Sequence, residues 1–125
     1  MSLQSLHEDK AAHNAKLYSS LNSSEYPDWV VVVLFYQGVH LIESILDIKG
    51  EHSESHLKRN EYMNDYVELF PRQIKIDYRE LERLSRQARY KPEYEITEEN
   101  LKTAFSCIES IKNWHTETKN KLCAT

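Results

Sequence analysis

One face of an apolar segment in the middle of the chain carries side chains that could do chemistry. Tyr36, His40, Glu43 or Ser44, and Asp47 recur at intervals of three and four residues, a spacing that places them in one row along a helix. The positions between them are mostly aliphatic. The row therefore needs water or polar partners from another part of the chain.

A second polar pair follows this segment. His56 and Arg59 are three residues apart, and the apolar stripe of the next predicted helix extrapolates back to them, so both side chains should face inward. An inward guanidinium requires a counter-charge, which Glu43 or Asp47 would supply. Two interpretations are open: a polar pocket that binds a phosphate or performs acid–base chemistry, in which His40 takes part, and a structural ion-pair network that fixes helix register.

A row of cations follows one face of the segment 72–90. Side chains three and four positions apart on one face could each neutralise a phosphate of a nucleic acid. The acids interleaved with the row favour instead a solvated face of compensated charge. Tyr90 beside Arg89 suggests a platform for base stacking, with a tyrosine at the edge of the core as the alternative. The row comprises Arg72, Lys75, Arg79, Arg83 and Arg86.

The histidines do not predict a metal site. His52 and His56 are four residues apart and could offer two ligands from one helical face, but zinc sites use three or four protein ligands and no third lies nearby in the sequence. The remaining histidines, His7, His13 and His115, are predicted at the surface or at helix edges. We expect neither a metal nor another cofactor.

Composition limits the elements that can position these groups. The chain has 125 residues, only 2 glycines and 3 prolines, and a formal charge of −4. Glycine-rich phosphate loops and tight hairpins are excluded, and there is no global attraction to nucleic acid. Polar residues interrupt the apolar segment 29–46, so no membrane span is expected. The two unpaired cysteines, Cys107 and Cys123, suit a cytoplasmic protein with reduced thiols.

Hydrophobic periodicity and breaks at Pro or Gly predict an all-α protein, an up-and-down helical bundle of four to five helices. The fully apolar start of the second helix, residues 29–36, must be covered by the chain itself or by a second subunit. We expect one domain over residues 1–125, with a core of about 3–118 and a frayed tail from 119. The predicted helices are 3–21, a second from a cap at Ser24 or Asp28 to 48 with Gly50 as its stop, a third from Ser53 or Ser55 to 69, 72–90, and a fifth that opens at Thr97.

Several pieces of the sequence, in this order and spacing, form a recognisable pattern: Tyr26 to Trp29, Leu34 to His40, Ser55 to Arg59, and Tyr78 to Leu81 with Leu84 to Tyr90. Together they resemble the HEPN family (higher eukaryote and prokaryote nucleotide-binding), in particular its small stand-alone prokaryotic members. The resemblance implies a helical bundle that dimerises through its central helices, and in many members a metal-independent ribonuclease. In those ribonucleases an Arg is followed four to six residues later by a His, whereas here His56 precedes Arg59.

The resemblance implies a cytoplasmic homodimer that binds a nucleotide or RNA phosphate, in a toxin–antitoxin or defence context with a nucleotidyltransferase or antitoxin as partner. The alternatives are a ribonuclease with a rearranged His/Arg constellation and a non-catalytic protein-interaction module. The predicted site has three catalytic candidates, His56, Arg59 and His40, and six ligand-binding candidates, Glu43, Asp47, Tyr78, Arg86, Arg89 and Tyr90.

Overall fold

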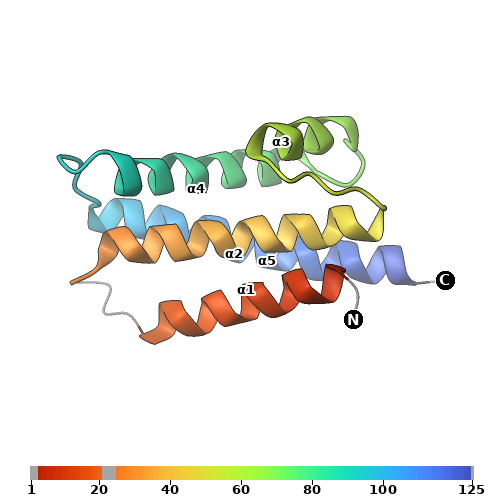
Figure 1. The fold of residues 1–125 in the computed structure, drawn as a ribbon, viewed down its shortest axis with the longest axis horizontal. Coiled ribbons are helices and arrows are strands. Elements are labelled where there is room, and N and C mark those ends of the chain that lie inside the picture. Colours follow the sequence, from red (N-terminus) through yellow and green to blue (C-terminus); the bar gives the residue numbers. More distant parts are fainter. Residues whose placement is uncertain (1–2, 21–24, 125) are drawn as a thin grey trace.

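Five helices make up the computed structural model, which describes residues 3–20 and 25–124. Four long helices run alternately up and down (Figure 1), and one short helix follows the second of them along the chain. No strand occurs in the described ranges, so the predicted all-α up-and-down bundle is confirmed. The helices are α1 (Leu3–Ser20), α2 (Pro27–Ile48), α3 (His56–Asp65), α4 (Arg72–Tyr90) and α5 (Glu98–Cys123).

The central helix is α2, which packs against α1, α4 and α5. Val30 and Val31 have no exposed surface, and Phe35 is 1% exposed. The chain's own helices thus cover residues 30–35 of this apolar start, whereas Trp29, its first residue, is 58% exposed. This helix is long and apolar enough to span a bilayer, yet 78% of its most apolar window is buried inside the protein, as is usual for a core helix.

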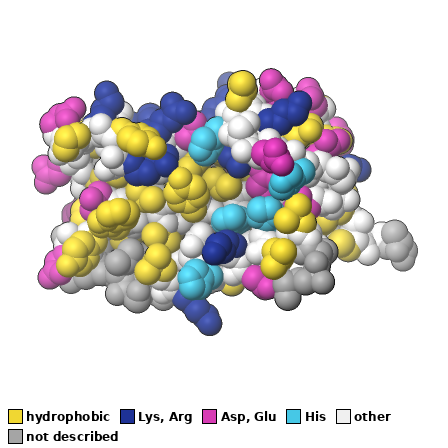
Figure 2. All heavy atoms as spheres, viewed as in Figure 1, with side chains coloured by type: hydrophobic (Ala, Val, Ile, Leu, Met, Phe, Trp, Pro, Cys, Tyr) yellow, Lys and Arg dark blue, Asp and Glu magenta, His cyan; other side chains and the backbone are white. Residues whose placement is uncertain are grey.

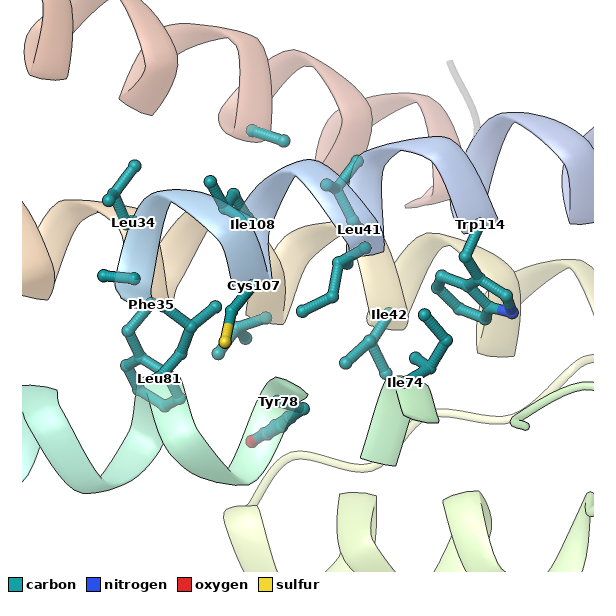
Figure 3. Packing of buried hydrophobic residues seen from close by; sticks show 14 of the residues in the cluster. Leu34, Phe35, Leu41, Ile42, Ile74, Tyr78, Leu81, Cys107, Ile108 and Trp114 are labelled. Carbon is teal, nitrogen blue, oxygen red and sulfur yellow. The ribbon is translucent and has the colours of Figure 1, made fainter. Parts of the chain in front are cut away.

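The core forms where α4 and α5 present their apolar faces to α2 (Figure 3). Leu81 and Leu84 of α4 and Ile111 of α5 are buried at 1% exposure or less. These residues occupy the apolar positions that recur with the 3.6-residue period of a helix in the sequence. This core fixes the rotation of α2 and α4, and therefore the direction of their polar residues.

The predicted boundaries of α4 and the predicted cap of α5 are confirmed. Thr97 forms a capping box with Asn100 at the start of α5. The start of α2 differs from the prediction, because Tyr26 is its N-cap without a side-chain hydrogen bond and Asp28 lies in the first turn behind Pro27. Ser24 lies outside the described residues. Gly50, at φ 81°, follows the end of α2 as predicted, in the left-handed conformation that glycine adopts without strain.

The third helix is shorter than predicted and ends at Asp65, with Tyr66 as its C-cap. The chain then turns and places the Phe70 ring 5.2 Å from the ring of Trp114. Pro71 disfavours a helical conformation only at Phe70, so the end of the helix at Asp65 goes with the packing of Phe70 against Trp114. The predicted apolar stripe included Val67 as an alternative to Tyr66, and Val67 is 64% exposed. Of the two predicted caps, Ser55 is correct, since its hydroxyl accepts the Lys58 amide.

Helix α5 continues past residue 119 to Cys123, so the segment that is predicted to fray is helical up to that residue. Lys119 Nζ lies 2.8 Å from Glu8 Oε2, and this contact joins the end of α5 to α1. Leu122 packs partly buried against the core. These contacts are between segments far apart in the sequence, so local composition did not reveal them.

Candidate functional site

A buried ion pair lies beneath the junction of α2, α3 and α4. Arg59 Nε donates to Glu43 Oε1 at 2.6 Å, and the Ser53 hydroxyl donates to the same oxygen. Arg59 is 7% exposed and Glu43 is 3% exposed. The predicted inward Arg59 is therefore present, and Glu43 is its counter-charge.

The guanidinium of Arg59 also contacts two further side chains, the half-buried His56 and the buried Tyr78. Its Nη1 lies 2.9 Å from His56 Nδ1 and donates to the Tyr78 hydroxyl at 3.0 Å. His56 Nδ1 and the Tyr78 hydroxyl are 3.4 Å apart. Side chains from three helices and one loop thus converge on Arg59, with the half-buried imidazole of His56 as the outermost member.

Burial and neighbouring charges keep this cluster in defined protonation states. Burial lowers the pKa of His56, and Arg59, Arg89 and Arg86 lower it further, while Glu82 raises it. The imidazole is therefore neutral at pH 7. Burial raises the pKa of Tyr78 to about 12 although Arg59 opposes this shift, so the phenol keeps its proton.

Arg89 of α4 places a second guanidinium among aromatic rings. Its Nη1 donates to the Tyr36 hydroxyl at 2.8 Å, and its Cζ lies 5.8 Å, 5.5 Å and 5.0 Å from the ring centres of Phe35, Tyr36 and Tyr90. These are cation–π distances. Tyr90 is 70% exposed, so a cation and an accessible aromatic face stand together.

The surface next to His56 combines these cations with apolar area. The ring centre of His56 lies 5.6 Å from that of Phe35. Arg86 is exposed and pairs with Glu82 at 3.5 Å. In the space-filling view, histidine side chains cross the middle of this face, with cationic and apolar side chains beside them (Figure 2).

The other side of the α2 polar row faces α1. His40 Nδ1 lies 2.7 Å from His7 Nδ1, and His7 Nε2 lies 3.5 Å from Asp47 Oδ2. Burial lowers the pKa of His40 to about 4, and His7, Lys10 and Arg59 contribute to this shift. Burial and then Glu43 raise the pKa of Asp47, against His7 and His52.

The predicted site residues therefore fall into two groups. Around Arg59 the structure brings together Glu43, His56 and Tyr78, with Arg86 and Arg89 close enough to affect His56. His40 and Asp47 belong to the side facing α1, so Asp47 does not pair with Arg59. Glu43 adjoins both groups, because it binds Arg59 and also lies near His7 and Asp47.

Four contacts of the polar row escaped the sequence analysis. His7 and His115 are predicted at the surface or at helix edges, but His7 binds His40, and His115 is 8% exposed with its Nε2 2.6 Å from the Ser44 hydroxyl. Ser53 was considered only as a cap, yet it binds Glu43. The fourth is the contact of Tyr36 with Arg89. The only signal for these contacts was that every member of the α2 row needed a partner.

Two other predicted features do not coincide with this cluster, although Arg86 of the cationic row adjoins it. His52 faces Asp47 and Glu54, whereas His56 faces Arg59 and Tyr78, so the two histidines do not form a common ligand pair. The cationic row of α4 is largely exposed, and Arg83 pairs with Glu80 at 2.5 Å. That pairing is typical of a solvated face.

Comparisons with protein-family models, with curated proteins and with solved structures found no match to this chain.

Proposed function

We propose that this protein binds a nucleotide or RNA phosphate on the surface where α2, α3 and α4 meet, around His56 and Arg89. The observation that supports this proposal is the convergence of polar groups from separate helices. His56 Nδ1 is held 2.9 Å from Arg59 Nη1, and the charges of Arg89 and Arg86 act on the same imidazole. A surface that gathers guanidiniums beside a neutral imidazole and an exposed aromatic ring suits a phosphate attached to a base.

Each group has a role that follows from its exposure. Arg86 is exposed and Arg89 half-buried, so both can meet phosphate oxygens. The exposed ring of Tyr90 stacks on a base, and neutral His56 exchanges a hydrogen bond with a hydroxyl or phosphate oxygen. Arg59 is buried and bound to Glu43, so it is a positioning residue that orients His56.

The resemblance to the HEPN family extends this proposal to a homodimer that acts beside a nucleotidyltransferase or antitoxin in a toxin–antitoxin or defence setting. An all-α bundle with a central helix is compatible with that family. Sedimentation at micromolar concentration tests the dimer, and a single species with the mass of one chain would contradict it.

A metal-independent ribonuclease is the second candidate, favoured by the neutral imidazole of His56 beside a fixed cation. In that reaction the 2′ oxygen of RNA attacks the adjacent phosphorus and loses its proton to His56, whose Nδ1 lone pair must first be released by Arg59. The bond to the 5′ oxygen breaks, and that oxygen takes a proton from water, because the lowered pKa of His40 leaves its imidazole uncharged and unable to act as the acid. Cleavage of unstructured RNA in EDTA, abolished in His56→Ala, would support it, whereas equal cleavage by the variant would exclude it.

Fluorescence anisotropy with a labelled single-stranded RNA tests the binding proposal. Arg89→Gln should weaken binding about tenfold or more and reduce the slope of log affinity against log salt by about 1. Tyr90→Ala should weaken binding with little change of this slope, because stacking involves no counterion release. Competition by ATP separates recognition of a free nucleotide from recognition of RNA.

Arg72→Gln is the matched control, because it removes an exposed arginine from the other end of the same helix. Absence of binding to millimolar RNA and ATP, or an equal loss in Arg72→Gln and Arg89→Gln, would contradict the proposal. If neither RNA nor ATP binds, the role of the buried network is only to specify helix packing, as in a protein-interaction module.

A further inference from the structure

Three potential metal ligands meet between α1 and α2, on the side of Glu43 away from the proposed phosphate surface. One ring nitrogen of His7 and one carboxylate oxygen each of Glu43 and Asp47 lie within 4.8 Å of one another. His7 Nε2 and Asp47 Oδ2 are the nearest measured pair, at 3.5 Å. Donors around a tetrahedral ion with bonds of 2.0–2.1 Å are about 3.3 Å apart. His7 and Asp47 are already near this spacing, and the other donor pairs would have to approach by up to about 1.5 Å.

The donor atoms of this cluster are buried and lack hydrogen-bond partners within the described part of the chain. This is true of His7 Nε2, Glu43 Oε2 and Asp47 Oδ2. The side chains of Glu43 and Asp47 are 4% and 5% exposed. Buried polar atoms are normally satisfied, and three unsatisfied atoms in one place indicate that a further group belongs there.

Charge balance points to a cation. Glu43 and Asp47 lie one helical turn apart on α2 and bring two carboxylates together. The nearest guanidinium, Arg59, is bound to the opposite oxygen, Glu43 Oε1. Two buried carboxylates with free oxygens are costly unless a positive charge compensates them.

The surroundings of His7 match those of a metal-binding imidazole. Its Nδ1 is 2.7 Å from His40 Nδ1, so one ring donates to the other. When His7 donates through Nδ1, the lone pair of Nε2 points toward Asp47. Ligating histidines ordinarily donate their second nitrogen to a neighbouring acceptor in this manner.

We propose that His7, Glu43 and Asp47 bind a divalent transition-metal ion, with His40 orienting His7. One imidazole and two carboxylates suit Zn²⁺ or Mn²⁺ more than Mg²⁺, which prefers oxygen ligands and retains its water. A cavity of about 520 Å³ borders the ligand His7, with Lys10, His13 and His40 also in its lining. His52 Nδ1, 4.0 Å from Asp47 Oδ1 and half exposed, is placed to join as a further ligand.

Calorimetric titration of the EDTA-treated full-length protein with ZnCl₂, MnCl₂ and MgCl₂ tests this site. Wild type should take up one Zn²⁺ per chain, more tightly than Mn²⁺ and far more tightly than Mg²⁺. His7→Gln and Asp47→Asn should each weaken Zn²⁺ binding at least tenfold. The Zn²⁺-induced rise of the thermal midpoint should shrink in both variants, because only binding to the folded state raises it.

His13→Gln is the control, since His13 is an exposed histidine of the same helix outside the ligand set. Circular dichroism of the metal-free variants verifies that they fold. Asp47→Asn keeps the shape of the original side chain, so it tests the site even if His7→Gln does not fold. No saturable uptake of Zn²⁺ or Mn²⁺ by wild type would overturn the proposal. So would equal affinities in wild type and both ligand variants, which would mean adventitious binding to surface histidines only. This proposal and that of the phosphate surface can fail separately, because neither test uses the other's ligand.

Discussion

Arg59 is the residue on which the buried network depends, since it contacts Glu43, His56 and Tyr78 at once. Arg59→Met should lower the free energy of unfolding by about 3–5 kcal/mol, because it leaves the Glu43 carboxylate buried without its partner. Combining it with Glu43→Leu should recover most of that loss. Urea unfolding of the two single variants and the double variant measures both effects.

Arg83→Met is the matched control for this experiment. Arg83 also pairs with a glutamate, Glu80, but its side chain is 48% exposed, and an exposed pair contributes about 1 kcal/mol or less. A loss in Arg59→Met as small as that in Arg83→Met would show that the buried pair does not support the fold.

His115 makes the stability depend on pH. Burial lowers its pKa, with Lys119 adding to this shift and Glu8 opposing it. The unfolded chain, with an ordinary histidine pKa near 6.5, therefore binds a proton that the folded chain does not. Stability should fall as the pH drops below about 6.5, by at most about 1.4 kcal/mol per pH unit for this one group.

His115→Gln, which can still bond to Ser44, should make stability fall less steeply from pH 7 to pH 5. Urea unfolding at several pH values, with His13→Gln as a comparison, isolates the contribution of this residue. Identical pH slopes for wild type and His115→Gln would contradict the assignment.

Residue patterns predicted only part of the site. The helical phase showed that His56 and Arg59 face inward, and it restricted the counter-charge to Glu43 or Asp47. It could not choose between those two, because residues four apart on one helix face are equivalent in the sequence. The choice depends on how α1 and the loop after α2 pack, since His7 meets Asp47 while Ser53 meets Glu43.

At the scale of helices, the two glycines have opposite roles. Gly38 lies within α2, and a methyl group there would meet Leu81 at 3.5 Å, an ordinary contact. Gly38→Ala should therefore raise the free energy of unfolding by up to about 1 kcal/mol through higher helix propensity. Gly50, with φ 81°, ends the helix, and Gly50→Ala should cost about 1 kcal/mol or more.

Thermal or urea unfolding of the two single variants measures these effects, and each variant serves as the control for the other. Destabilisation by Gly38→Ala equal to that of Gly50→Ala would mean that the core around Leu81 has no room for a methyl group.

The helices were predictable where local signals decide them. Hydrophobic periodicity predicted the bounds of α4 correctly, and the capping residue Thr97 predicted the start of α5. The end of α3 and the extent of α5 were not predictable, because they depend on Phe70 packing against Trp114 and on Lys119 binding Glu8. Such contacts join residues distant in the sequence, where periodicity carries no information.

For the whole molecule, the central position of α2 predicts where the structure opens last. This helix packs against three others, while α1 packs mainly against α2. Native-state hydrogen exchange should find the slowest amides in the middle of α2, around Ile42 and Ile45, which have no exposed surface, and faster exchange in α1. Equal protection of α1 and α2 would contradict this ranking.

Glu43 divides its carboxylate between two neighbours, with one oxygen held by Arg59 and the other turned from it and unbonded among the described residues. A cation that takes the free oxygen would draw negative charge away from Arg59, and with it the support that orients His56. Cation binding on one side of α2 and phosphate binding on the other would then change each other's affinity by the same factor, as thermodynamic reciprocity requires. A single buried side chain would in this way couple ligand binding at two separate surfaces.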